Sequence, residues 1–200
     1  MNESTNIYDL LMDGGDIPNI AEVPREDGRM LGNHEPGDIV TLGNRQYIVL
    51  EHKDGITAVI AKEIVHYMAF GRDADYANSE VRKWLNREFY KELIDAVGKE
   101  NIVSHIIDLA ADDGTGEGKC VSDFVSILTA PRYRKYRRFL PAYGQWWWTA
   151  TRVNCDNSSY ARYVCGVRSN GVLDWYDSGN DDGGGGVRPF CFLKSSIFVD

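Results

Sequence analysis

A chain of 200 residues, 43% hydrophobic and 12% aromatic, is long enough to bury a core of its own without disulfide bonds or a structural metal. The formal net charge of -8 argues against nucleic acid and anionic membrane surfaces as main partners. Four cysteines are too few and too scattered for a disulfide framework, and no CxxC or paired-histidine motif predicts zinc. We therefore expect one globular domain with no metal and no cofactor.

Residues 1–35 have the pattern of an N-terminal arm, and we expect the folded domain over residues 36–200. Ile7, Leu10 and Leu11 suit a single helical turn, after which glycines and prolines interrupt any regular element. The arm lacks a basic stretch followed by an apolar run, so we expect no signal peptide and no membrane insertion. Synthesis in the cytoplasm, with reduced thiols, is the corresponding expectation.

Three β-rich runs open the domain, at residues 39–42, 47–50 and 56–60. Turn-forming pairs separate them, Gly43-Asn44 and then Asp54-Gly55. This alternation predicts an antiparallel meander.

A helical period follows Ser79, a residue type that caps helix N-termini. Gly98 is the predicted end of this helix. Residues 102–109 then have strand character. Ser122 is expected to cap a second helix carrying Phe124, Val125 and Leu128.

Pro131 suits the first turn of a further helix over residues 131–140. This segment holds five cations, with Tyr133 and Tyr136 among them. One interpretation is a nucleic-acid patch. The other is a surface helix whose tyrosines pack inward and whose cations balance nearby acids, and the negative net charge favours it.

The stretch from Gln145 to Leu193 has the most unusual composition of the chain. It opens with Trp146, Trp147 and Trp148 and closes with an apolar run over 187–193, and Lys, Glu, Gln and Met are all missing between Trp146 and Leu193. Its interior is rich in Tyr, Ser, Gly, Asn and Asp, which is typical of antibody-like binding surfaces, and also of a hydrophilic loop end of a β domain. Ser169-Asn170-Gly171 predicts a hairpin with a type I′ turn. Trp147, inside an apolar run, is expected to be buried, whereas Tyr160, Trp175 and Tyr176, among Asn, Asp, Ser and Gly, are expected to be exposed. Strands, then helices, then strands predict an α+β class.

The Trp run and the Gly186-Val187-Arg188-Pro189 ending resemble motifs of a family of bacterial and phage domains. The folds of these domains are similar to those of C-type lectins and formylglycine-generating enzymes. The segments 37–40, 47–50 and 79–86 agree, so the resemblance covers about residues 36–199. It implies a C-type-lectin-like α+β fold with antiparallel sheets, two or more helices and a loop-rich binding face.

Some members of that family are variable proteins of diversity-generating retroelements, in which a reverse transcriptase mutates template adenines. Asparagine codons of the AAC type then become many others, but never those of Lys, Glu, Gln, Met or Trp. The first four types are the ones missing here, whereas Trp175 departs from the pattern.

The resemblance therefore implies a non-enzymatic ligand- or receptor-binding protein, such as a phage or bacterial adhesin, with a variable region over 152–186. Its partner would be a protein or glycan on a cell surface, and association with a virion is one implied location. The implied ligand-binding residues are Asn154, Asp156, Asn157, Ser158, Ser159, Tyr160, Tyr163, Arg168, Asp174, Trp175, Tyr176, Asp177, Ser178, Asn180, Asp181 and Asp182.

Other functions stay open. A structural phage-tail or assembly domain would carry the same loops merely as surface. A formylglycine-generating-type oxidase would need a redox-active or copper-binding cysteine pair, for which Cys155 and Cys165 are the candidates. The four histidines have no local Ser or Cys partner, which argues against acid–base catalysis. A calcium loop begun at Asp177 would put Arg188 at a ligand position, although a lectin-type calcium site drawn from separate loops stays open.

Overall fold

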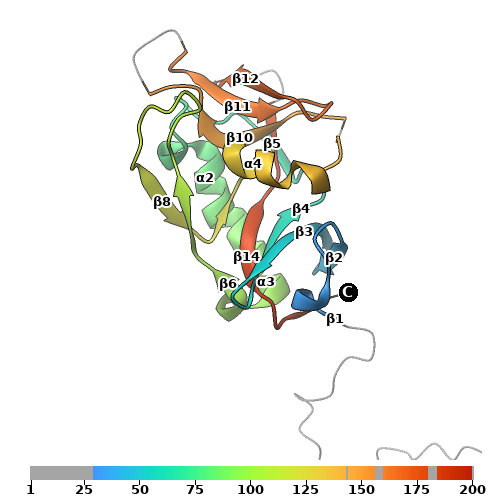
Figure 1. The fold of residues 1–200 in the computed structure, drawn as a ribbon. Helices are drawn as coiled ribbons and strands as arrows, with labels where there is room; N and C mark the ends of the chain where they lie inside the picture. Colours follow the sequence, from blue (N-terminus) through green and yellow to red (C-terminus); the bar gives the residue numbers. More distant parts are fainter. Residues whose placement is uncertain (1–28, 143, 156–159, 180–183, 200) are drawn as a thin grey trace, which may run out of the picture.

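The computed structural model describes residues 29–142, 144–155, 160–179 and 184–199. In this part of the chain two large sheets and two helical stretches form an α+β fold, as the order of elements predicted. Figure 1 shows β10, β11 and β12 of one sheet above β2, β3 and β4 of the other, and the two sheets share buried core residues. None of the described helices is long and apolar enough to cross a membrane.

The first large sheet contains the predicted meander. Its strand order is β2-β3-β4-β14-β6, and β9 also pairs with β14. Its strands are β2 (Ile39–Leu42), β3 (Arg45–Lys53), β4 (Ile56–Ala61), β6 (Ile102–Val103), β9 (Val125–Ser126) and β14 (Phe190–Lys194). Asp54 and Gly55 both have positive φ, at 52° and 74°, which suits a tight turn between β3 and β4.

The second large sheet has the order β12-β11-β10-β13-β5. Its strands are β5 (His66–Met68), β10 (Trp147–Arg152), β11 (Tyr163–Val167), β12 (Leu173–Asp177) and β13 (Gly185–Val187). The two motifs that carry the family resemblance are neighbours here, because β10 and β13 run parallel with Trp147 opposite Gly186.

The hairpin of β11 and β12 is confirmed, but its predicted type I′ turn is wrong. Among the described non-glycine residues only Asp54 has positive φ, so Asn170 does not, whereas Gly171 has φ 79°. Gly171 N–H donates to the Arg168 carbonyl at 2.9 Å, and Arg168 N–H donates to the Val172 carbonyl at 2.8 Å. This is a three-residue loop in which one glycine supplies the left-handed conformation.

Residues 29–35, which the sequence assigned to the arm, belong to the folded domain. The strand β1 (Arg29–Met30) pairs with β15 (Phe198–Val199). Leu31 is completely buried in the core, and its N–H donates to the carbonyl of Ile197 at 2.8 Å. The last strands of the chain thus hold this segment, a long-range pairing that local sequence does not reveal.

The first helical stretch runs from α2 (Glu80–Trp84) through a π turn (Leu85–Phe89) into α3 (Tyr90–Val97). The predicted boundaries are confirmed. The Ser79 hydroxyl accepts the N–H of Arg82 at 3.0 Å, and Gly98 ends the helix with φ 80°.

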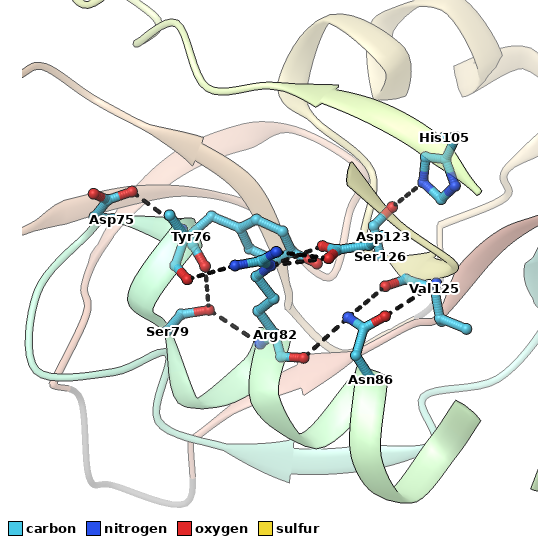
Figure 2. Close-up of polar contacts among 10 residues, drawn as sticks. Asp75, Tyr76, Ser79, Arg82, Asn86, His105, Asp123, Val125 and Ser126 are labelled. Carbon is cyan, nitrogen blue, oxygen red and sulfur yellow. Dashed lines mark hydrogen bonds and ion pairs between the residues drawn. The ribbon is translucent and has the colours of Figure 1, made fainter. Parts of the chain in front are cut away.

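The helix predicted from Ser122 is wrong, because that segment forms strands. Residues 120–123 are β8 (Cys120–Asp123), paired with β7 (His105–Asp108), and β9 follows at once. Figure 2 shows the contacts of this segment with the first helix. The Arg82 guanidinium donates to the Asp123 carboxylate at 2.8 to 3.0 Å, and the Asn86 amide donates to the Val125 carbonyl at 3.0 Å. Tertiary contacts therefore hold this segment extended.

The second helical stretch begins with α4 (Ala130–Tyr136) and continues as a 3₁₀ turn (Arg137–Phe139). Tyr133 and Tyr136 are buried, as the surface-helix interpretation requires. On its outer side Arg134 pairs with Asp112 at 2.9 Å and Lys135 pairs with Glu51.

Candidate binding surface

The hairpin of β11 and β12 lies at one edge of the second sheet, since β12 is an end strand in its order. Directly opposed residues of antiparallel strands lie on the same face of a sheet. Cys165 opposes Trp175, and Val164 opposes Tyr176. Trp175 and Tyr176 therefore lie on opposite faces of the hairpin.

One face carries a group of rings that we call the aromatic face: Tyr160, Tyr163 and Trp175. The Tyr160 ring lies 6.0 Å from that of Tyr163 and 5.9 Å from that of Trp175. Tyr160 is 50% exposed and Trp175 is 52% exposed, as predicted for both. Arg162 and Asp177 form an ion pair nearby at 3.1 Å. Rigid rings beside charged and polar groups make a surface suited to binding a macromolecule.

The prediction that Tyr176 is also exposed is wrong. Its ring is partly buried and stacks on Trp146, with centroids 4.0 Å apart and planes within 10°. Trp148, which is completely buried, meets both rings edge-on at 4.7 and 6.2 Å. Because neighbouring residues of a strand alternate between faces, Tyr176 points away from Trp175 and into this stack.

Two more predicted ligand-binding residues have little exposed surface. Asn154 is 8% exposed and Ser178 is completely buried. The Ser178 carbonyl accepts the N–H groups of Phe70 and Gly71 at 3.0 and 3.2 Å, which ties the end of β12 to the segment before α2. Neither side chain is placed to contact a ligand at the surface.

The remaining predicted residues divide into three sets. Arg168 is exposed, at the turn of the hairpin, and its guanidinium pairs with the Asp174 carboxylate at 2.5 Å. Tyr163, Asp174 and Asp177 are half-buried. Seven lie outside the described residues: Asp156, Asn157, Ser158, Ser159, Asn180, Asp181 and Asp182.

The face with the ring stack also holds a pocket that sequence reasoning missed, which we call the ring pocket. It measures about 680 Å³, and its lining includes Tyr67, Gln145, Trp146, Arg168, Asn170 and Tyr176. It brings together β5, the segment before β10 and the hairpin, which are far apart in the sequence. A sequence signal existed in Gly166 and Gly185, both of which lie against its rings.

The described cysteines and histidines give little support for a catalytic site. Burial raises the pKa of the Cys165 thiol to about 12, so this thiol is a poor nucleophile at neutral pH. His105 lies 2.8 Å from the Ser126 hydroxyl, but both groups are buried. Burial beside Arg132 lowers the pKa of His105 to about 3. Among the described residues no three His, Cys, Asp or Glu side chains are grouped to hold a metal ion.

The described residues thus define an α+β domain with an exposed, ring-bearing hairpin at one sheet edge. A family model described as a domain of unknown function, DUF6273, matches residues 53–125. The match ends at the first residue of β9, so the hairpin and the ring pocket lie outside it. No curated protein and no solved structure matches the chain.

Proposed function

We propose that this chain is a non-enzymatic binding protein with a C-type-lectin-like scaffold, whose β11–β12 hairpin presents a diversified surface as in retroelement variable proteins. The ligand is a protein or glycan on a cell surface, and the protein acts as a phage or bacterial adhesin.

The observation that carries this proposal is the contrast between the aromatic face and the strands behind it. Tyr160 and Trp175 are about half exposed, although rings of this size are on average more deeply buried in folded proteins. Trp147 and Trp148 lie in β10, the third strand from this edge, and are almost completely buried. A rigid scaffold that bears exposed aromatic anchors is the usual construction of a high-affinity binding surface.

The state of the cysteines supports binding over the oxidase alternative. Cys165 lies in the interior with Val153 and Ala130 around it, and its thiol is protonated at neutral pH. Cys155 lies instead against the loop after β7, where its N–H donates to the Thr115 hydroxyl at 2.9 Å. A redox-active pair needs an accessible thiolate, and Cys165 does not offer one.

The test is to sequence the DNA beside the gene and the gene itself from many related isolates. We expect a reverse-transcriptase gene, a near-identical template repeat, and substitutions confined to codons 152–186 that start from template adenines. Codons for Tyr160, Arg168 and Asp174 should vary, while those for Trp147 and Arg188 should not. Absence of a template repeat together with uniform codons across isolates would reject diversification.

A further inference from the structure

The ring pocket is preorganised by the protein core. Its floor is the Trp146–Tyr176 stack, and Trp148 supports both rings from the interior. The Trp148 indole N–H donates to the Met68 carbonyl at 2.9 Å, which fixes this support against β5. A ligand that lies on Trp146 therefore meets a ring that is already in place, so binding costs little side-chain entropy.

Two glycines on different strands leave the space that this stack needs. A Cβ on Gly166 would lie 2.7 Å from the Tyr176 ring. A Cβ on Gly185 would lie 2.4 Å from the Trp148 indole nitrogen and 2.6 Å from Trp146. Neither glycine has a positive φ, so close packing of the rings, and not backbone conformation, accounts for both of them.

The one charge in the described lining is balanced by a carboxylate beside the pocket. Arg168 is its only cation among the described residues, and the Asp174 carboxylate pairs with it. Asn170 and Gln145 add neutral amides; the Asn170 carbonyl oxygen accepts the Val172 N–H at 3.1 Å, which leaves its amide nitrogen as a donor. A phosphate would compete with Asp174 for Arg168, and an ammonium group would be repelled by Arg168. This balance of charge favours a neutral ligand.

We propose that the ring pocket binds a neutral saccharide, with an apolar C–H face of the sugar on Trp146 and its hydroxyls on Arg168 and Asn170. A sugar ring has this combination of one apolar face and a rim of hydroxyls. The volume of about 680 Å³ is within the range of small-molecule sites and accommodates one or two sugar rings. The inference rests on the proposed function in that the hairpin binds a ligand, but it uses the face opposite to Tyr160 and Trp175.

Saturation-transfer NMR on the full chain tests this directly. The probes are the methyl glycosides of glucose, galactose and mannose, with N-acetylglucosamine, glucuronic acid and glucosamine. At least one neutral sugar should receive saturation, strongest at the C–H protons of one ring face, and the two charged sugars should receive less. Absence of transfer to every neutral sugar would overturn the proposal, and so would equal transfer to the charged ones.

Variants then locate the binding site. Trp146→Ala should weaken binding of the retained sugar about thirtyfold, as for an aromatic anchor. Arg168→Gln should weaken it about tenfold without affecting folding, because this side chain is exposed. Phe198→Ala removes a ring with 53% exposure on β15 and should change nothing.

The outcomes also separate this inference from the proposed function. If Trp175→Ala abolished sugar binding while Trp146→Ala and Arg168→Gln kept it, the sugar would lie on the aromatic face and the ring pocket would be rejected. If Trp146→Ala lost sugar binding but codons 152–186 were uniform across isolates, the sugar site in the ring pocket would be supported and the proposed diversification would be rejected.

Discussion

The guanidinium of Arg188 lies over the ring of Trp147, 5.0 Å from its centroid, and both side chains are buried. Arg188 also donates to the carbonyl oxygens of Ala61 and Lys62 at 3.1 and 3.0 Å. Burial lowers the pKa of Arg188 to about 10, so the group stays charged at neutral pH. One side chain thereby joins the end of β4 in the first sheet to β10 in the second.

Replacing Arg188 by Met should lower the free energy of unfolding by about 2–3 kcal/mol, because two carbonyls lose a charged donor. Denaturant melts measure this change. The matched control is Arg168→Met at an exposed site, where we expect a change of about 0.5 kcal/mol or less. Equal effects of the two substitutions would show that Arg188 does not join the sheets.

Trp147→Ala should lower the free energy of unfolding by about 3–5 kcal/mol, since this ring is 2% exposed and packs edge-on against Tyr133 at 5.5 Å. Trp175→Ala should cost about 0.5 kcal/mol, because half of its ring is in solvent. The same melts compare the two. Severe destabilisation by Trp175→Ala would show that Trp175 is a core residue and that the binding surface does not include it.

Gly185→Ala should lower the free energy of unfolding by about 1–3 kcal/mol, because the added methyl group collides with Trp146 and Trp148. Gly179→Ala is the control, since its Cβ would have only ordinary contacts at 3.6 and 3.8 Å. Near-ultraviolet circular dichroism should change for Gly185→Ala alone, as the ring stack is displaced. An unchanged spectrum would contradict the packing described for these rings.

His105 should make stability depend on pH. Its pKa of about 3 in the fold, caused by burial and by Arg132, lies below its ordinary 6.5. The unfolded chain thus binds a proton on this residue below pH 6.5 and the folded chain does not, so stability is lost as pH falls. Between pH 6.5 and 5 the loss from His105 is about 2 kcal/mol.

A His105→Gln variant tests this dependence by urea melts at several pH values. It should have a flatter stability profile over pH 5–6.5 than the native chain. The control, His66→Gln, changes an exposed histidine stacked on Trp84 and should keep the native slope. The prediction fails if both variants keep that slope.

Thiol labelling should divide the cysteines by burial. Burial raises the pKa of Cys165 and of Cys191 to about 12, whereas Cys120 is exposed. In native buffer iodoacetamide should modify Cys120 and leave Cys165 and Cys191 unmodified until the chain unfolds. Mass spectrometry of the peptides reads this out, and rapid native modification of Cys165 would revive the oxidase alternative.

Features that depend on local chemistry could be predicted from the sequence. The Ser79 cap, the Gly98 end and the antiparallel meander follow from propensities that act over a few residues. Burial of Trp147 followed from the apolar run around it. The exposure of Tyr160 and Trp175 was likewise indicated by their polar neighbours.

Features that depend on residues far away in the sequence could not be predicted from it. Residues 122–128 have helical spacing of apolar groups, yet Val125 pairs with Cys191 and Asp123 binds Arg82. Tyr176 has polar neighbours in sequence, yet its partner is Trp146, which only the arrangement of strands brings to it. The ring pocket was missed for the same reason, since its described lining comes from four separate parts of the chain.

The position of β12 at the end of its sheet limits how far a substitution in the hairpin can propagate. Within the described sheet β12 hydrogen-bonds to β11 alone, and five consecutive pairs from Tyr163–Asp177 to Val167–Leu173 set its register. A change at Asp174 or Trp175 therefore disturbs one strand pair, while β10, β13 and the Arg188–Trp147 contact keep their own partners. Substitutions on the exposed side of β12, where Trp175 lies, therefore leave the strands behind the hairpin in register, whereas Tyr176 on the other side is part of the ring stack.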